Sequence, residues 1–261
     1  MSIRNSFLWI AAGGAAVYTV LRELRKQDGR LSAIEAQQAA LQIQIRDEGR
    51  NLYRQMQAIT WLHDQFEFNV PLPPMRGWAA SPDFAALLVT LIREHTPQTV
   101  VELGGGTSTI LTAKTLRELR EGHVYAVEAL EPFANSAHAN LQQHGLDDIA
   151  TVIHAPITRV NAGERALMWY DMDELEALPE IDMLVVDGPA QYSTDRRMVR
   201  YPALPMLYNK LSPDALIVMD DTLREDERIA AERWLAEFPD LRQIAEYTEL
   251  EKGALVFKRG S

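Results

Sequence analysis

Cysteine is absent from this chain of 261 residues, and its absence excludes several kinds of chemistry at once. Without thiols the chain cannot form disulfides, thiolate zinc sites or a cysteine nucleophile. Basic residues are also scarce, since 26 Lys or Arg face 37 Asp or Glu and the formal net charge is −11. Residues 1–60 hold eight Lys or Arg and five Asp or Glu, so the acidic excess lies in the remainder. We therefore expect no nucleic-acid partner.

One long uncharged apolar run is present, residues 7–21 (FLWIAAGGAAVYTVL), and a basic cluster follows it (Arg22, Arg25, Lys26 and Arg30). As a helix, fifteen residues span about 22 Å, less than the roughly 30 Å hydrocarbon core of a bilayer. Snorkelling flanks allow such a helix to cross a thin bilayer, and the basic cluster places the following chain in the cytoplasm. The expectation is a single-pass membrane anchor over residues 1–23, at the cytoplasmic face of the inner (plasma) membrane. A packed or peripheral helix and a signal sequence are the alternatives.

The next segment carries a heptad pattern. With Leu24 at position a, nine of thirteen a and d positions as far as Phe66 are apolar, which favours a coiled coil and a homo-oligomer. An amphipathic helix folded back on its own domain is the alternative. Pro71, Pro73 and Pro74 break any helix. We therefore predict a helical stalk over residues 24–69 and a separate domain over residues 70–261.

A glycine-rich turn is the most informative feature of that domain. The apolar strand Val100–Leu103 contains Glu102, and Gly104, Gly105 and Gly106 follow it, ahead of Thr107, Ser108 and a helical pattern. Glycines let the chain turn sharply and let a ligand approach the main chain. The helix behind them directs free N–H groups into the same space. A second strand then ends at Glu128, 24 residues after Gly104, where nucleotide-binding folds place a carboxylate on a ribose.

The kind of adenosine ligand depends on the third glycine of the dinucleotide pattern. Thr109 stands there, and Glu102 suits a cationic ligand better than a diphosphate. The run Val101–Gly106 resembles motif I of the class I S-adenosylmethionine-dependent methyltransferases. This resemblance implies that S-adenosylmethionine is the cofactor and that residues 102 and 104–108, with Glu128, bind it. A nicotinamide-binding enzyme and a generic glycine corner are the alternatives.

Strand and helix patterns alternate through the rest of the domain. Apolar strands are expected at residues 150–154, 181–186, 215–219 and 254–258, with helices at 131–144, around 173–178, at 203–210 and at 225–238. Continuously apolar strands separated by helices predict an α/β fold, a Rossmann-like doubly wound sheet that is mostly parallel. Four strands end in acids or glycines, and ligands bind at that edge of such sheets. The convergence predicts a ligand site there.

Three acids at two strand ends suggest a metal. Asp187 follows the fourth strand, and Asp220 and Asp221 follow the fifth, a pattern similar to that of catechol O-methyltransferase-like enzymes, where Asp and Asp-Asn surround Mg²⁺. This similarity implies Mg²⁺ at Asp187, Asp220 and Asp221, and carboxylate oxygens suit that ion. Asp221 departs from the expected Asn. The alternative is a charge cluster in which Asp221 pairs with Arg224 or Arg228.

A bacterial group often linked to cell-envelope glycans supplies a further resemblance over roughly residues 72–261. The resembling residues are Gly77–Pro82, Ala155-Pro156, Trp169–Asp171, Val186–Pro189, Arg200–Pro205 and Asp220-Asp221. The resemblance implies a glycan or small-molecule acceptor. His154 is a further candidate for the adenine edge, with a structural histidine as its alternative. Tyr170, Arg197, Arg200 and Tyr201 are candidates for acceptor contacts, and Arg200 alternatively neutralises Asp187.

These observations favour an S-adenosylmethionine-dependent methyltransferase that acts on a sugar or polysaccharide hydroxyl at the membrane. Asp187 is the candidate catalytic residue, beside both cofactor and acceptor. Methylation of a protein or a small molecule remains an alternative, as does a non-catalytic scaffold whose coiled coil recruits partners.

Overall fold

The computed structural model describes residues 3–162, 165–190 and 198–260, with side chains from Arg22 onward. The chain divides into two compact units, Met1–Tyr53 and Arg54–Ser261. The predicted three-part division at residues 23 and 69 stays a prediction. Arg197, a candidate for acceptor contacts, lies outside the described residues.

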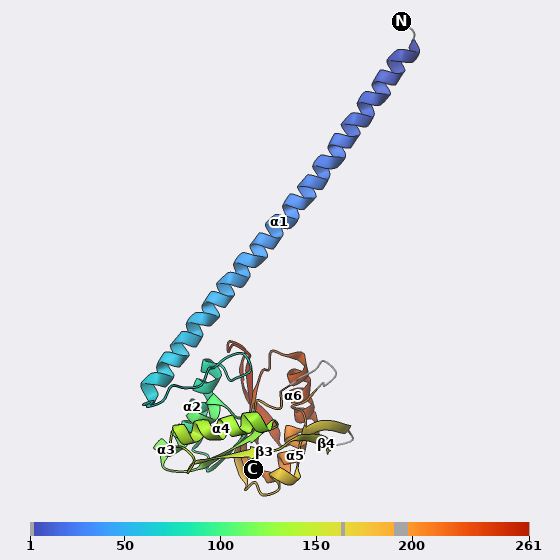
Figure 1. Ribbon diagram of the computed structural model, residues 1–261. Helices are drawn as coiled ribbons and strands as arrows, with labels where there is room; N and C mark the ends of the chain where they lie inside the picture. The colour runs from blue at the N-terminus through green and yellow to red at the C-terminus, as the bar shows by residue number, and fades with distance from the viewer. Residues whose placement is uncertain (1–2, 163–164, 191–197, 261) are drawn as a thin grey trace. The chain divides into compact units, whose positions relative to one another are not determined.

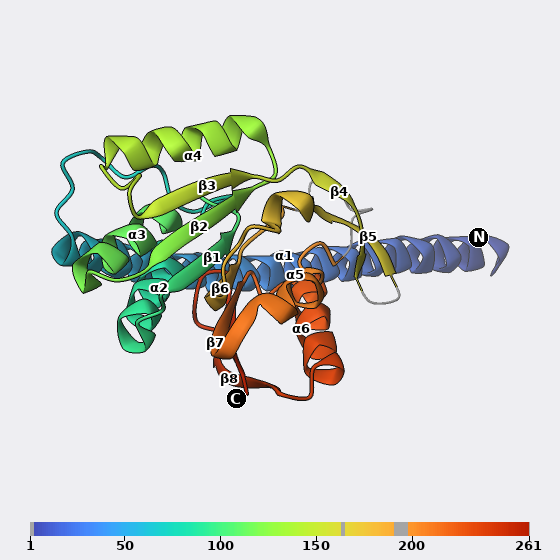
Figure 2. The same ribbon diagram turned by 90° about the horizontal axis from the view of Figure 1, so that it is seen from below.

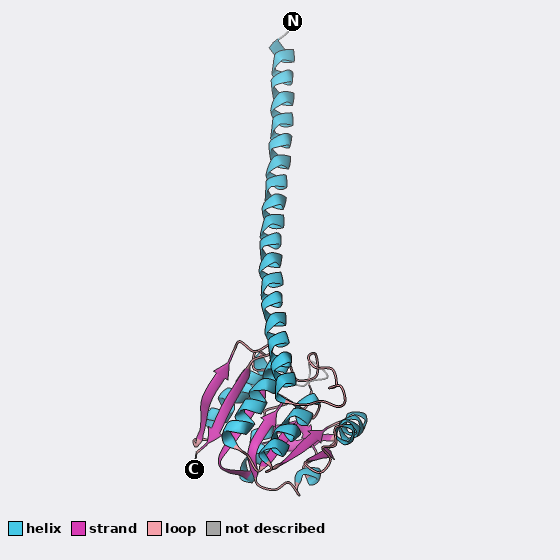
Figure 3. Cartoon of the chain, turned by 90° about the vertical axis from the view of Figure 1, so that its left-hand side faces the viewer, coloured by secondary structure: helices cyan, strands magenta, loops and turns pink. Residues whose placement is uncertain are grey.

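The helix α1 (Ile3–Gln65) is continuous through both N-terminal segments that the sequence suggests (Figure 3). In the first unit, apolar heptad side chains are about half exposed, from 49% at Leu24 to 59% at Ile45. Among the helical residues whose side chains are described, no helix is long and apolar enough to cross a membrane. The expected anchor, residues 7–21, lies outside that part of the chain. The coiled coil and the anchor therefore stay predictions.

Seven strands form one sheet in the second unit, in the order β3-β2-β1-β6-β7-β9-β8 (Figure 2). The first five in this order are parallel, and β9 and β8 add antiparallel pairs at one side. Their bounds are β1 Thr99–Leu103, β2 His123–Glu128, β3 Ala150–His154, β6 Ile181–Val186, β7 Leu211–Asp220, β8 Leu241–Tyr247 and β9 Ala254–Arg259. The Rossmann-like, mostly parallel sheet expected from the apolar strands is confirmed.

Helices cover both faces of this sheet (Figure 1). Val100 and Val185 pack in one apolar layer with α2 and α3, whereas Val101 and Val186 pack in another with α5 and α6. The helix bounds are α2 Pro82–His95, α3 Thr107–Leu119, α4 Glu131–Gln143, α5 Ala203–Leu207 and α6 Glu225–Glu237. Successive strand residues point to opposite faces, so strands covered on both sides must be apolar throughout.

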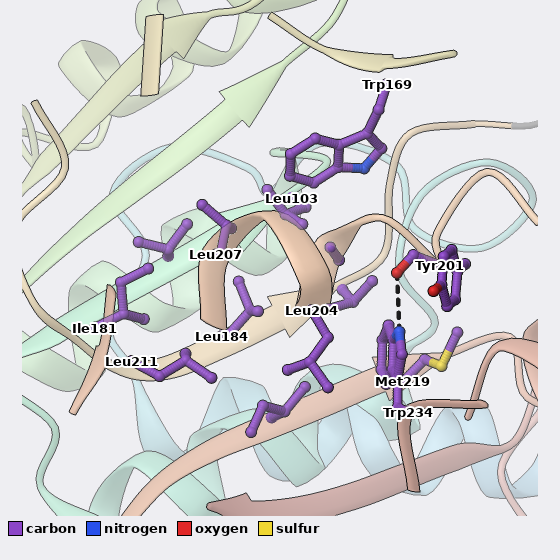
Figure 4. Close-up of a cluster of buried hydrophobic side chains, with 14 of the residues drawn as sticks. Leu103, Trp169, Ile181, Leu184, Tyr201, Leu204, Leu207, Leu211, Met219 and Trp234 are labelled. Atoms are coloured by element: carbon purple, nitrogen blue, oxygen red, sulfur yellow. Dashed lines mark hydrogen bonds between the residues drawn. The ribbon is translucent and has the colours of Figure 1, made fainter. Parts of the chain in front are cut away.

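Figure 4 shows the layer that contains α5 and α6. Fully buried Trp169 and Trp234 pack there with leucines from the strands and from α5. The Trp234 indole N–H donates to the backbone oxygen of Tyr201 at 2.8 Å, which ties α6 to the segment before α5. Trp169 and Trp234 therefore belong to the core.

Three elements differ from the prediction. The helix expected around residues 173–178 is only a 3₁₀ turn, η1 (Asp173–Leu175). A two-stranded antiparallel sheet, β4 (Ile157–Ala162) with β5 (Arg165–Tyr170), precedes it, and the edge strand β8 was also not expected. β4 and β8 mix polar with apolar residues, so they lack the apolar run that identifies a buried strand. β5 does contain such a run, residues 166–170, which the prediction missed.

Candidate active site

The strand order reverses beside β1, which pairs with β2 on one side and β6 on the other. Leu103 is in register with Val127 and with Val186, so the three strands end at one level. In open parallel sheets this position is where ligands bind. The segments that follow the three strands therefore meet at one edge.

The turn after β1 requires its glycines. Gly104 has φ 91°, a left-handed conformation that favours glycine, and its N–H donates to the Val127 oxygen at 2.9 Å. A Cβ on Gly188 would lie 2.9 Å from the Gly104 nitrogen and would also overlap the Tyr170 hydroxyl. The turns after β1 and β6 thus pack backbone against backbone.

Glu102 supports this turn from beneath. Its side chain is buried, and its Oε2 accepts a hydrogen bond from the Thr109 hydroxyl at 2.7 Å. The Thr109 oxygen in turn accepts from the Gly106 N–H at 3.0 Å, at the start of α3. Burial raises the pKa of Glu102 to about 7, although hydrogen bonds from Ser108 and Thr109 oppose the shift. Glu102 is not among the residues that line the cavity described below, and it contacts the loop through Thr109.

Glu128 ends β2 and faces the cavity directly. Its carboxylate accepts backbone hydrogen bonds from Gly105 and Ala129. Burial nevertheless raises the pKa of Glu128 to about 7. A partly desolvated carboxylate beside a glycine turn can accept hydrogen bonds from the hydroxyl groups of a ribose.

A cavity of about 560 Å³ lies over these strand ends. It is large enough for a small ligand together with part of a second one. Its walls include Pro73, Trp78, Gly104, Gly105, Gly106, Thr107, Ser108, Glu128, Phe133, Asn140, Tyr170, Asp187 and Gly188. The predicted loop residues, Glu128 and Asp187 therefore share one cavity, whereas His154 is exposed and is not among the lining residues.

The acids after β6 and β7 also come together. One carboxylate oxygen from each of Asp187, Asp220 and Asp221 lies within 4.8 Å of the others, and all three side chains are at least nine-tenths buried. Arg200 enters this group. Its Nη2 lies 2.5 Å from Asp221 Oδ2 and 3.3 Å from Asp187 Oδ1, and its Nη1 donates to the Asp220 backbone oxygen at 2.8 Å.

The ionisation of the group follows from burial and from these contacts. Burial raises the pKa of Asp187 to about 6, while the Arg200 charge limits that rise. Burial and the charges of Asp187 and Asp221 raise the pKa of Asp220 well above its usual value. Arg224 Nη1 lies 3.0 Å from Asp221 Oδ2, so the structure contains the pair of Asp221 with Arg224 that belongs to the alternative of a charge cluster.

Several residues at this edge were not predicted from the sequence. Trp78, Phe133 and Asn140 line the cavity, the last two from α4, the helix that follows Glu128. Lys252, before β9, lies 3.9 Å from Asp221 Oδ1 and donates to the Ala79 oxygen at 3.1 Å. The helical spacing of Phe133 and Asn140, seven residues apart, is the pattern that points to one face of a helix.

The comparisons with known proteins agree with this geometry. Residues 101–222 match a family model described as a methyltransferase domain. This match covers slightly less than half of the chain. A comparison with curated proteins gives no match.

Solved structures of low sequence identity share the fold of this domain. The O-methyltransferase TomG from Streptomyces achromogenes, in complex with S-adenosylmethionine, is 18% identical, with a TM-score of 0.55 and coverage of 82% of this chain and 96% of TomG. An O-methyltransferase from Bacillus cereus, in complex with S-adenosylhomocysteine, is 17% identical, with a TM-score of 0.52 and coverage of 78% and 90%. This chain therefore shares its fold with these two O-methyltransferases of known structure, which bind S-adenosylmethionine and S-adenosylhomocysteine, respectively.

Proposed function

We propose that this chain transfers a methyl group from S-adenosylmethionine to a hydroxyl group of its acceptor. The observation that carries the proposal is the single cavity of about 560 Å³, lined both by the glycine turn with Glu128 and by Asp187. Oxygen as the methylated atom draws support from the similar folds of TomG and the B. cereus enzyme, both described as O-methyltransferases.

The residues of the cavity have separate tasks. Glu128 accepts hydrogen bonds from the two ribose hydroxyls, and the start of α3 offers backbone N–H groups. When bound, the cofactor supplies an electrophilic methyl group on a sulfonium. Asp187, whose pKa of about 6 leaves it largely ionised at pH 7 to 8, accepts the hydrogen bond or proton of the acceptor hydroxyl. Most of the rate enhancement comes from alignment, because oriented reactants avoid a large entropic cost.

The acceptor that we propose is a sugar or a polysaccharide intermediate. Support comes from the resemblance of segments such as Gly77–Pro82 and Arg200–Pro205 to a glycan-associated bacterial group. Labelled methyl transfer into lipid-linked sugar extracts tests this proposal. Label that appears only in protein or in small molecules contradicts the glycan acceptor and leaves methyl transfer intact.

We also propose that residues 7–21 attach the chain to the cytoplasmic face of the membrane and that the heptad segment joins two or more copies. Support comes from the basic residues behind the apolar run and from the half-exposed heptad leucines. Fractionation of the full-length protein tests the anchor, and cross-linking tests the oligomer. A full-length protein that stays in the soluble fraction, or that cross-links only as a monomer, contradicts the respective proposal.

Titration calorimetry of S-adenosylhomocysteine into the full-length protein tests the cofactor assignment. We expect micromolar binding. Absence of binding by protein shown to be folded would contradict the proposed function and would favour the scaffold.

A further inference from the structure

The buried acidic group of Asp187, Asp220 and Asp221 already contains a cation, the Arg200 guanidinium. The Arg200 side chain is only 4% exposed and touches all three residues. Its Nη2 lies between Asp187 Oδ1 and Asp221 Oδ2, and its Nη1 bonds the Asp220 backbone. A side chain of the protein thus lies between two of the three carboxylates and is bonded to the backbone of the third residue.

A divalent ion bound to Asp221 Oδ2 would lie close to the Arg200 charge. Mg²⁺ sits about 2.1 Å from each ligand oxygen. An ion bound to Asp221 Oδ2 would lie at most about 4.6 Å from Nη2, since that nitrogen is 2.5 Å from the same oxygen. Two positive charges at this separation in a buried site repel each other strongly.

The charges of the group are nearly balanced without a metal. Four carboxyl groups, those of Asp187, Asp220, Asp221 and Glu227, face the cations of Arg200, Arg224 and Lys252. One negative charge remains when all of them are ionised, and a dication would turn that excess into a positive one. A site that needs Mg²⁺ instead keeps its carboxylates for the ion and for water.

Arg200 is also held in place by its neighbours in sequence. The Ala203 N–H donates to the Arg200 oxygen at 3.1 Å. The next residue, Tyr201, is 2% exposed and receives the Trp234 hydrogen bond (Figure 4). The backbone on this side of Arg200 is therefore fixed in the core, which holds the guanidinium among the acids.

We propose that Arg200 takes the place of the divalent ion in this site, so that methyl transfer by this chain requires no metal. Arg200 is a positioning residue: it fixes Asp187, which faces the cavity, while Lys252 and Arg224 complete the neutralisation of Asp220 and Asp221. The catalytic part of this inference rests on the proposed function, whereas the metal-binding part does not.

Direct metal titration of the full-length protein is the first test. After dialysis against EDTA, Mn²⁺ is titrated by calorimetry into wild type and into Asp187→Asn. We expect the same weak surface binding in both proteins. A single Mn²⁺ bound more than tenfold tighter by wild type than by Asp187→Asn would overturn the proposal.

Removal of the guanidinium is the second test. In Arg200→Met the acids lose their internal cation, so we expect Mn²⁺ to bind at least tenfold tighter than in wild type and to raise the melting temperature. Arg200→Lys, which keeps a cation, and Arg228→Met, which removes an exposed guanidinium from α6, should not gain this binding. A folded Arg200→Met that gains no Mn²⁺ binding contradicts the proposal. If Arg200→Met does not fold without metal, recovery of its fold by Mn²⁺ supports the proposal, and otherwise the wild-type titration decides.

Cofactor binding and methyl transfer separate this inference from the proposed function. S-adenosylhomocysteine should bind the wild type equally in Mn²⁺ and in EDTA, and methyl transfer should be unchanged by EDTA. Loss of transfer in EDTA that Mn²⁺ restores overturns the metal independence alone. Absence of S-adenosylhomocysteine binding in both buffers overturns the proposed function and leaves the Mn²⁺ result to stand by itself.

Discussion

The carboxyl edge of the sheet has two halves, the ends of β1 and β2 and the ends of β6 and β7, and their acidic residues differ in whether a cation of the protein pairs with them. At the ends of β1 and β2, Glu102 is buried and Glu128 is partly buried, neither with a cation in contact among the described residues, and desolvation raises the pKa of each to about 7. After β6 and β7, the acids are neutralised internally by Arg200 and its neighbours. In the first half Glu128 is available to a ligand, whereas the acids of the second half are already paired with cations of the protein.

Asp187 stands at the boundary of these halves. It lines the cavity, yet its carboxylate is held by Arg200 at 3.3 Å. An unpaired buried carboxylate is costly, whereas one held by a guanidinium keeps its charge and its position. The difference between the halves predicts that substitutions in the second mainly change stability and that substitutions in the first mainly change ligand binding.

The largest effect should follow loss of Arg200, in Arg200→Ala. Removing one partner of a buried ion pair leaves the other charge uncompensated, which costs about 3–5 kcal/mol. We expect the free energy of unfolding to fall by about that amount, measured by urea denaturation. Arg228→Ala, at an exposed arginine, should change it by less than about 0.5 kcal/mol. If both substitutions lowered the free energy of unfolding equally, the proposed stabilising role of Arg200 in the second half would be contradicted.

The contact between the two halves is tested by Gly188→Ala. The added Cβ would lie 2.9 Å from the Gly104 nitrogen and would overlap the Tyr170 hydroxyl, so backbone must move. Overpacking of this kind costs about 1–3 kcal/mol of stability, and the displaced turn should also weaken S-adenosylhomocysteine binding. Gly106→Ala is the control for stability, because nothing lies within 4 Å of its Cβ position and its φ of 172° is extended. A fully stable Gly188→Ala would contradict the tight packing of the turns.

Glu128→Ala should act on binding rather than on stability. We expect the affinity for S-adenosylhomocysteine to fall tenfold or more, about 1.4 kcal/mol, because the ribose hydroxyls lose their acceptor. Calorimetry measures the affinity, and thermal melting confirms that the variant is folded. Glu131→Ala, an exposed acid at the start of α4, should stay within about twofold of wild type. Unchanged affinity in Glu128→Ala would remove the ribose assignment.

The sequence predicted those strands whose burial requires a continuous run of apolar residues. The strands ending in Leu103, Glu128, Val186 and Asp220 are apolar because both their faces are covered, and their final residues lie where the fold places ligands. β4 and the edge strand β8 lack such a run, because polar residues interrupt them and solvent reaches part of each strand.

Side-chain partners distant in sequence were harder to predict. The pair of Arg200 with Asp187, which are thirteen residues apart, was predicted only as an alternative. Lys252 meets Asp221 across 31 residues, through the pairing of β9 with β7. No local pattern encodes such a contact, because it depends on strand register and on the turn that precedes β9.

The smallest effect should be the pH dependence of cofactor binding. Because the pKa of Glu128 in the free protein is raised to about 7, its carboxyl is mostly protonated at pH 6 and mostly ionised at pH 8. The ionised form accepts hydrogen bonds from both ribose hydroxyls, so the affinity for S-adenosylhomocysteine should rise about threefold to fivefold between these values. Calorimetry at pH 6, 7 and 8 measures the change. In Glu128→Gln, whose amide does not titrate, the affinity should be weaker and nearly independent of pH. A slope that survives in Glu128→Gln and disappears in Glu102→Gln would assign the titration to the buried acid beneath the turn instead.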